Sequence, residues 1–181
     1  MSIPELRSYG YRFPPLDERV TLLRETISVM KAMWTESEVS FNGQMIHLSH
    51  AVCEPKPIQK TGPPIWIGGR HRRLLDAAAE FADGWNHWEV QGEKLRKLAT
   101  YLRSKCAEFH RPVGSVIESW AGTVGPLTND NTLTENRVRE LKSQHEENTR
   151  YFIASFPTNA TKKTYESFAE AVSSPSWSET E

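Results

Sequence analysis

The amino-acid sequence predicts an α/β protein whose strands form one parallel sheet. After an amphipathic helical segment near the N-terminus, short apolar strand-like segments alternate with helical segments four times. Strands that alternate with helices pair in parallel through right-handed crossovers. The length of 181 residues is enough for one domain with a sizeable core, so we expect a single domain over residues 1–181.

The first 35 residues contain the clearest helical pattern. Residues Met1–Pro14 are aromatic and rich in turn formers, so we expect an ordered loop there. Between Leu16 and Trp34, apolar residues recur at three- and four-residue steps and form one stripe along a helix. Pro15 suits the first turn of that helix.

A β-hairpin is expected between this helix and the regular alternation. Asn42-Gly43 separates two strand-like runs, Glu38–Phe41 and Gln44–Leu48, and Asn-Gly is the favoured two-residue hairpin turn. A connector rich in proline follows over residues 51–64. The hairpin is therefore an insertion before the strand–helix units.

Four strand–helix units complete the chain. The strands are expected at residues 65–67, 83–88, 116–124 and 151–156, and the helices near 71–82, 93–109, 135–147 and 165–172. Ligands of parallel sheets bind at the carboxyl ends of the strands, which here are residues 68–71, 86–88, 124–129 and 156–159. Residues Ser173–Glu181 are polar and acidic, and we expect a flexible tail.

Composition excludes several classes of protein. A formal net charge of −1 does not indicate a nucleic-acid-binding or membrane-surface protein. The sequence has neither an apolar run long enough to span a bilayer nor a signal-peptide core. Cys53 and Cys106 are too few for a disulfide framework, although one bridge stays open. We therefore expect a soluble, cytoplasmic protein with free thiols.

The stretch from Pro63 to Arg73 is the best candidate for a binding site. An apolar strand leads into Gly68-Gly69, and the next helix begins with Arg70 and His71. Glycines let the backbone approach a ligand, first-turn N–H groups attract anions, and arginines, here also Arg72 and Arg73, bind phosphate in a bidentate way. The alternative is a tight turn with solvated arginines, which the local pattern alone favours. Basic residues oppose the dipole at a helix start, which indicates an anion there.

Other candidate chemistry is weaker. His47, His50 and Cys53 are spaced like metal ligands, but no fourth ligand follows, so no metal site is expected. Neither Ser119 nor Ser155 lies in a Gly-x-Ser-x-Gly elbow, which argues against a hydrolase triad.

Two further kinds of residue lie near the expected ligand edge. His71 and His87 are candidates to donate to a phosphate or to titrate near neutrality, or they are structural histidines. Trp85 and Trp88 are candidates to pack on a flavin ring, or they belong to the core. The residues themselves indicate no catalytic group.

Six segments, in the same order and spacing, resemble the luciferase-like flavin and deazaflavin oxidoreductases. They are Tyr9–Arg19, Met33–Thr35, Val39–Gly43, Glu54–Gln59, Pro63–Gly69 and Ala82–Asn86. Tyr151–Ala171 resembles the last strand and helix of the family less specifically. The resemblance implies a TIM (β/α)8 barrel, which needs ~250 residues. This chain then corresponds to a partial barrel, strands five to eight preceded by the fourth helix, and the first half is absent.

The resemblance also implies a cofactor site and a reaction. Gly68, Gly69, Arg70 and His71 would form the phosphate side of the pocket, and Asn86 would end a strand facing the cofactor. The cofactor would be FMN, used with oxygen, or the deazaflavin coenzyme F420, used for hydride transfer, and the substrate a small organic molecule. The alternative is a non-catalytic half-barrel, either a relic or a subunit that needs a partner.

A half-barrel leaves two open sheet edges and one uncovered apolar face. We therefore expect a homo-oligomer, or a partner chain that supplies the missing half-barrel. The apolar residues expected to supply both faces of the sheet are Ile65, Ile67, Trp85, Trp120, Phe152 and Phe156.

Overall fold

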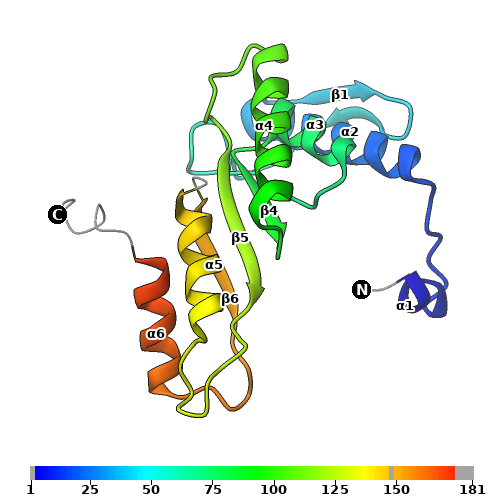
Figure 1. Cartoon of the computed structure of the whole chain (residues 1–181). Coiled ribbons are helices and arrows are strands. Elements are labelled where there is room, and N and C mark those ends of the chain that lie inside the picture. The colour runs from blue at the N-terminus through cyan, green and yellow to red at the C-terminus, as the bar shows by residue number, and fades with distance from the viewer. Residues whose placement is uncertain (1–2, 147–148, 174–181) are drawn as a thin grey trace. The chain divides into compact units, whose positions relative to one another are not determined.

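The computed structural model describes residues 3–146 and 149–173 (Figure 1). The chain falls into two compact units, an N-terminal unit of residues 1–64 and a sheet unit of residues 65–181, and each is described by itself. The expectation of a single domain over the whole chain therefore stays a prediction.

The N-terminal unit begins with two helices. α1 spans Ile3–Ser8, where the sequence led us to expect a loop over Met1–Pro14. Glu5 in its first turn and Arg7 in its last turn complement the helix dipole, which offsets the turn-forming residues around it. α2 spans Leu16–Thr35, which confirms the predicted helix.

The predicted hairpin is confirmed, but its turn is longer than expected. β1 (Val39–Asn42) pairs antiparallel with β2 (His47–Ala51), and Asn42 lies opposite His47. The loop therefore spans residues 43–46, closed by a hydrogen bond from the Gly43 N–H to the Ile46 carbonyl. The prediction of a two-residue Asn42-Gly43 turn was wrong because the loop bonds to a side chain of α2.

That side chain is Glu25. Its carboxylate accepts hydrogen bonds from three consecutive backbone N–H groups, those of Gln44 (2.6 Å), Met45 (2.9 Å) and Ile46 (2.8 Å). Desolvation by burial acts to raise the pKa of Glu25, but the three N–H donors and the nearby His47 outweigh it, so the pKa lies below its usual value. An internal anion thus sets the shape of this loop.

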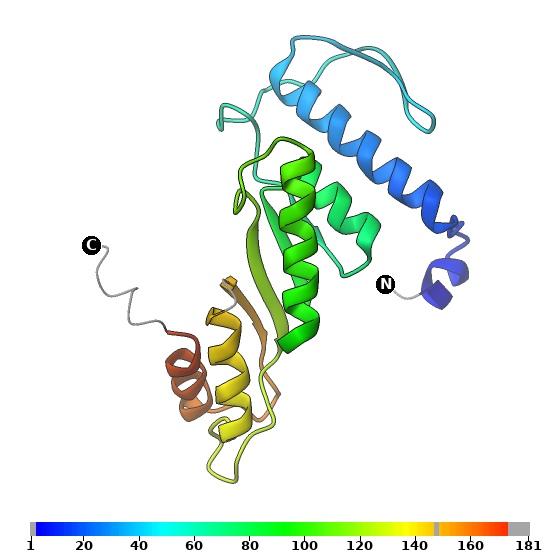
Figure 2. The ribbon, with the colours of Figure 1, turned by 45° about the horizontal axis from the view of Figure 1, so that its top comes forward.

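The sheet unit contains four strand–helix units, as predicted. Its strands are all parallel and lie in sequence order, β3-β4-β5-β6. The elements in chain order are β3 (Trp66–Gly68), α3 (Arg72–Phe81), β4 (Gly84–Trp88), α4 (Gly92–Glu108), β5 (Ile117–Thr123), α5 (Glu135–Glu146), β6 (Thr149–Ser155) and α6 (Lys162–Val172). Figures 1 and 2 show α5 and α6 side by side, with α5 between α6 and β6. Ser173 caps α6, and the rest of the predicted tail, residues 174–181, lies outside the described residues.

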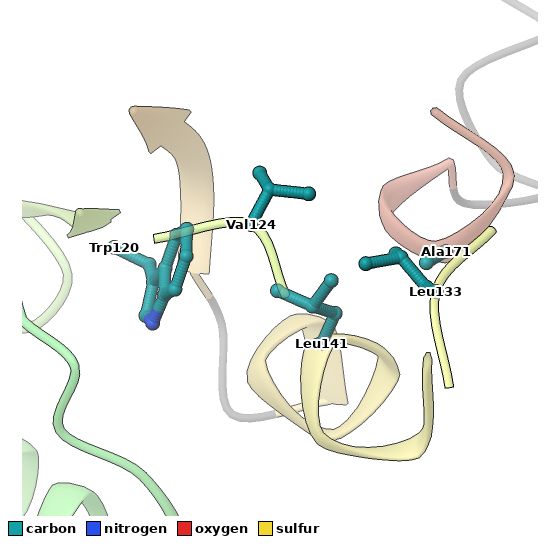
Figure 3. Close-up of a cluster of buried hydrophobic side chains, with 5 residues drawn as sticks. All are labelled: Trp120, Val124, Leu133, Leu141 and Ala171. Atoms are coloured by element: carbon teal, nitrogen blue, oxygen red, sulfur yellow. The ribbon is translucent and has the colours of Figure 1, made fainter. Parts of the chain in front are cut away.

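One face of the sheet is covered by these helices. Partners in a parallel ladder share a face, and Ile67, Trp85, Trp120 and Phe152 lie together on this one. At its β5–β6 end lies a cluster of buried hydrophobic side chains from β5, α5, α6 and the loops between them (Figure 3): Trp120, Val124, Leu133, Leu141 and Ala171. No described helix is long and apolar enough to cross a membrane.

The other face, which we call the open face, has its own large side chains. Trp66, Trp88, Tyr151 and Ile153 are between 41% and 58% exposed. Apolar strand residues supply both faces, as expected, but the expected residues that lie in strands β3 to β6, namely Ile67, Trp85, Trp120 and Phe152, are all on the helix-covered face, and other residues supply the open face. The aligned open-face positions carry no charged side chain: Trp66, Gly68, Gly84, Asn86, Trp88, Ile117, Ser119, Ala121, Thr123, Tyr151, Ile153 and Ser155.

Glu25→Gln should loosen the hairpin loop because an amide oxygen accepts the three N–H bonds more weakly than a carboxylate. We expect faster amide hydrogen exchange at Gln44, Met45 and Ile46. The pKa of Glu25 is lower in the folded state than its ordinary value of 4.5. The stability that the carboxylate contributes to the fold is therefore present above pH 4.5 and is lost as the pH falls through the folded-state pKa. Glu18→Gln, on the same helix but bonded to Arg12, is the matched control, and equal exchange in both variants would contradict the idea.

His87 should make the sheet unit less stable in mild acid. Its ring is fully buried on the helix-covered face, 5.0 Å from the Trp85 ring, and neither ring nitrogen has a hydrogen-bond partner among the described residues. Burial lowers its pKa to about 4, so only the unfolded chain binds this proton between pH 6.5 and about 4. Stability should therefore fall by about 2 kcal/mol between pH 8 and pH 5 from this group alone.

Urea unfolding at both pH values checks this expectation. His87→Leu should remove that part of the pH dependence, whereas His110→Asn, at an exposed histidine with positive φ, should keep it. An unchanged pH dependence in His87→Leu would show that other groups carry it.

Candidate functional site

The turn after β3 is fixed by the neighbouring strand β4. Gly69 has a φ of 121°, its N–H donates to the Asn86 carbonyl at 3.0 Å, and its own carbonyl accepts from Trp85 Nε1 at 2.7 Å. A Cβ on Gly69 would lie 2.7 Å from Leu74 Cδ1, so the turn requires glycine on both grounds. Two predicted site residues, Gly69 and Asn86, are thus in direct main-chain contact.

The start of α3 follows immediately, in the predicted order of strand, turn and helix. His71 is the N-cap residue: its Nδ1 accepts from the Arg73 N–H at 3.3 Å and its carbonyl accepts from Leu74 at 2.9 Å. No hydrogen bond between described residues uses the N–H of Arg70 or Arg72. The turn therefore presents backbone donors to an anion, as an exposed helix N-terminus does.

The arginines of this stretch do not act together. Arg70 is exposed beside the turn, but the guanidinium of Arg72 lies over the Tyr101 ring of α4, 5.0 Å from its centroid. Tyr101 in turn donates to Asp76 at 2.7 Å, which raises the pKa of its hydroxyl. The Arg72 guanidinium thus lies against α4, whereas Arg70 is exposed beside the turn, and phosphate binding by either arginine stays a prediction.

Asn86 lies on the open face, in the middle of the sheet. Its Nδ2 donates to the Ser119 Oγ of β5 at 2.7 Å, and the two residues are partners in the ladder. Ser119 is fully buried, while Asn86 is half-buried. This pair places a neutral polar group among the open-face side chains.

Aromatic side chains surround that polar pair. Trp66 and Tyr151 meet edge to face with ring centroids 5.7 Å apart, although they come from the two outer strands β3 and β6. Trp66 reaches over Gly84, where a Cβ would lie only 2.3 Å from the indole ring. Trp88 lies at the carboxyl end of β4 and is 56% exposed. The open face thus offers flat apolar surfaces beside a neutral hydrogen-bonding pair.

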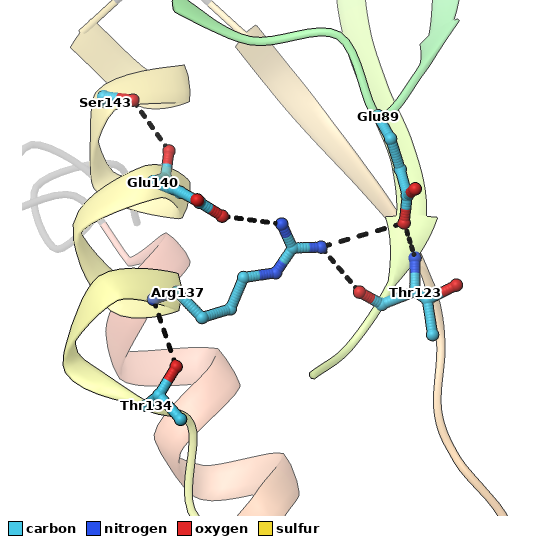
Figure 4. A network of polar contacts seen from close by, with 6 residues as sticks. All are labelled: Glu89, Thr123, Thr134, Arg137, Glu140 and Ser143. Atoms are coloured by element: carbon cyan, nitrogen blue, oxygen red, sulfur yellow. Dashed lines mark hydrogen bonds and ion pairs between the residues drawn. The ribbon is translucent and has the colours of Figure 1, made fainter. Parts of the chain in front are cut away.

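A charged cluster fixes the carboxyl end of β5 (Figure 4). Arg137 of α5 donates to the Thr123 carbonyl at 2.6 Å, and the Glu89 carboxylate accepts from the Thr123 N–H at 2.9 Å. Arg137 also pairs with Glu140 at 2.9 Å, and its guanidinium lies 5.3 Å from the Trp120 ring centroid. We call Glu89, Thr123 and Arg137 the rim clamp.

Two predicted ligand-edge residues lie away from the open face. His87 is fully buried on the helix-covered face, so its ring does not face a ligand on the open face, and burial lowers its pKa to about 4. Trp85 is buried on that face too, and its role is to hold Gly69. The strand alternation explains both, because each residue is one position away from Asn86.

The histidines with ligand-like spacing serve the hairpin. His47 Nδ1 lies 2.8 Å from Asn42 Oδ1, and His50 Nδ1 contacts the Glu38 carboxylate. Among the described residues, no three His, Cys, Asp or Glu side chains come together as a metal site would require.

Sequence reasoning missed the open-face residues Ser119, Thr123 and Tyr151. They can be identified by starting at Asn86, passing to its partners in the neighbouring strands, and taking every second residue from there. This procedure needs the pairing register as well as the positions of the strands. The rim clamp was also missed, because Arg137 and Glu89 come from segments 48 residues apart in the sequence.

Comparison with known proteins identifies relatives. The family model described as luciferase-like monooxygenase matches residues 2–173. The FMNH(2)-dependent dimethylsulfone monooxygenase of Pseudomonas putida is 33% identical over 105 residues, which are 57% of this chain and 28% of that protein.

Solved structures show the same fold at low identity. An F420-dependent secondary alcohol dehydrogenase in complex with an F420-acetone adduct has a TM-score of 0.78 at 12% identity, covering 93% of this chain and 66% of that one. A long-chain alkane monooxygenase has a TM-score of 0.58 at 17% identity, covering 69% of this chain and 34% of that one.

The chain therefore spans only part of the length of the relatives it matches. Its parallel sheet, which the order of strands and helices predicted, corresponds to part of their barrel, as the resemblance implied. With the family model matching nearly the whole chain, the chain belongs to the luciferase-like monooxygenase family.

Proposed function

We propose that this chain forms one half of the cofactor pocket of a flavin- or deazaflavin-dependent oxidoreductase, FMN or F420 being the cofactor. The observation that carries this proposal is the Gly69 turn. It presents backbone N–H groups beside the exposed Arg70, and it adjoins an open face with uncharged and aromatic side chains. These features fit a molecule with a phosphate at one end and a flat ring at the other.

Each part of the site has a role in this function. The N–H groups of Arg70 and Arg72, together with the Arg70 guanidinium, hold the phosphate, and His71 keeps the helix start in place. Asn86 fixes the turn through its carbonyl and offers its side chain to the open face. The bound cofactor supplies the redox chemistry, oxygen activation for a reduced flavin or hydride transfer for a deazaflavin.

The sequence relative supports FMN over F420. The dimethylsulfone monooxygenase of Pseudomonas putida is named as FMNH(2)-dependent and is 33% identical over the matched region. The substrate is then a small organic molecule that is oxidised with molecular oxygen. Since the aligned open-face positions of the described strands carry no charged side chain, we propose that this half of the pocket does not select for a charged substrate.

The open face also needs a cover in the working protein. β3 and β6 are outer strands of the sheet, and Trp66, Trp88, Tyr151 and Ile153 are exposed between them. Exposed strand edges and aromatic surface favour association. A second copy, or a chain that supplies the other half-barrel, is proposed to provide this cover. Because the chain covers 28% of the relative, a non-catalytic half-barrel that needs such a partner is the second candidate.

Gly69→Ala should weaken binding of FMN more than binding of riboflavin. The substitution strains a position at φ 121° and displaces the N–H groups that meet the phosphate, which riboflavin lacks. We expect roughly a tenfold loss for FMN, equivalent to about one strong hydrogen bond to a charged group, and a smaller loss for riboflavin. Flavin fluorescence titration measures both.

Gly114→Ala is the matched control for that experiment. Gly114 also has a positive φ, 86°, and open space around it, but it lies in the loop after α4. Equal losses for both flavins in Gly69→Ala would indicate general misfolding. If the unmodified chain binds neither flavin, the catalytic proposal fails for this chain and the non-catalytic half-barrel is favoured.

The oligomeric state should show whether the open face needs a cover. We expect sedimentation at micromolar concentration to show self-association, or else a monomer that binds hydrophobic dyes and stops doing so when the other half-barrel is added. A dilution-stable monomer that binds no dye would contradict the need for a cover.

A further inference from the structure

The rim clamp holds both main-chain groups of Thr123 through charged side chains. The Thr123 N–H donates to Glu89 and the Thr123 carbonyl accepts from Arg137. Arg137 is only 8% exposed, whereas its carboxylate partners Glu89 and Glu140 are each more than 40% exposed. Burying a cation is unfavourable unless its bonds repay the lost hydration. The position of Thr123 is thus set by a buried charged group.

Glu89 is itself held in a rare backbone conformation. Its φ is 46°, in the left-handed region that residues other than glycine seldom adopt. Its N–H donates to the Ala121 carbonyl at 2.9 Å, which continues the ladder past the end of β4. Strained residues of this kind concentrate at functional sites, because packing must enforce them.

The side chain of Thr123 lies on the open face at the ligand edge. Ser119, Ala121 and Thr123 alternate with the helix-covered residues of β5, and Thr123 is the partner of Ser155 in β6. Both hydroxyl residues are exposed. Two neighbouring strands therefore end in a pair of hydroxyl groups on the uncharged face.

This hydroxyl pair lies across the sheet from the Gly69 turn. β3 is separated from β5 and β6 by two and three strand spacings, about 10–14 Å across the strands. Thr123 also lies four residues, about 13 Å, beyond Ser119, which is in the same row of the ladder as Gly68, so the two places are roughly 16–19 Å apart. An extended ligand of about that length, held by its phosphate at Gly69, would meet the hydroxyl pair with an uncharged end. Hydroxyl groups both donate and accept, so they suit a neutral ring with carbonyl and N–H groups.

We propose that Thr123 and Ser155 bind the uncharged, hydrogen-bonding end of the ligand, and that Arg137 is a positioning residue acting through Thr123. The proposal rests on the proposed function, because it takes the Gly69 turn as the phosphate end. Thr123 contacts the ligand, and Arg137 and Glu89 hold its backbone so that the hydroxyl keeps its direction. The ligand class is a neutral planar heterocycle, for which riboflavin is the probe.

Thr123→Val and Ser155→Ala test the contact. Valine keeps the shape of threonine and removes only the hydroxyl, so the backbone bonds to the rim clamp stay. We expect riboflavin and FMN to lose affinity equally, by roughly two- to tenfold, as for one lost hydrogen bond. Thr100→Val, at an exposed threonine on α4, is the matched control and should change neither. This pattern differs from that of Gly69→Ala, which affects FMN more.

A double-mutant cycle tests the positioning role. As a single variant, Arg137→Gln should weaken riboflavin binding. In the Thr123→Val background the same substitution should cause no further loss of affinity, because the hydroxyl that Arg137 orients is then absent. A merely structural role of Arg137 would instead give additive losses. If Arg137→Gln does not fold, the same cycle can be made with Glu89→Gln and Thr123→Val, because Glu89 is half-exposed. Glu140→Gln, which leaves both Thr123 bonds intact, should bind normally.

The outcomes separate the two proposals. If the unmodified chain binds riboflavin and Thr123→Val and Ser155→Ala bind it equally well, the contact is refuted and the proposed function stands. If losses from Arg137→Gln and Thr123→Val add, the positioning role is refuted. If the unmodified chain binds neither flavin, the proposed function fails and this inference fails with it.

Discussion

Parallel pairing of four strands in sequence order is the constraint on which the sheet unit depends. Partners in such a ladder share a face, so one register decides for every strand residue whether it meets a helix or the open face. His87 and Asn86 show the consequence. They are neighbours in the sequence, yet one is a fully buried neutral ring and the other a half-buried amide bonded to Ser119.

The same register determines on which face of the sheet the charged side chains lie. Glu118, nearly buried on the helix-covered face, pairs with Arg103 of α4 at 2.9 Å, and Arg137 lies on that side against Trp120. Each is a buried charge that bonds a helix to β5: Glu118 of β5 pairs with Arg103 of α4, and Arg137 of α5 donates to the Thr123 carbonyl of β5. Such bonds hold a helix against the sheet. The aligned positions of the open face have no charge at all. Charge thus anchors the scaffold, while neutral groups face the proposed ligand.

Much of this fold could be predicted because the determinants are local. The stripe from Leu16 to Trp34 and the strand–helix alternation depend on spacing along the chain, and both were confirmed. The hairpin turn was misjudged because Glu25, 18 residues before Gly43, takes the loop's N–H groups. The faces were misjudged because assigning them needs the register. The part of the candidate site at Gly68–His71 was predicted because its residues are consecutive in the sequence. The part at Ser119, Thr123 and Ser155 was missed because only the pairing of the strands brings these residues together.

In two of the described turns several backbone N–H groups lie close together, and the turns differ in the acceptor that is available to these groups. In the loop of residues 43–46, three consecutive N–H groups are taken by the carboxylate of Glu25, so the chain supplies its own anion. At residues 69–72 the chain satisfies the N–H of Gly69 through Asn86, and no described hydrogen bond uses those of Arg70 and Arg72. Arg70, an exposed side chain in this turn, is itself a cation, so it adds to the positive potential of the N–H groups instead of cancelling it. An anion from outside the chain is the partner that this arrangement fits.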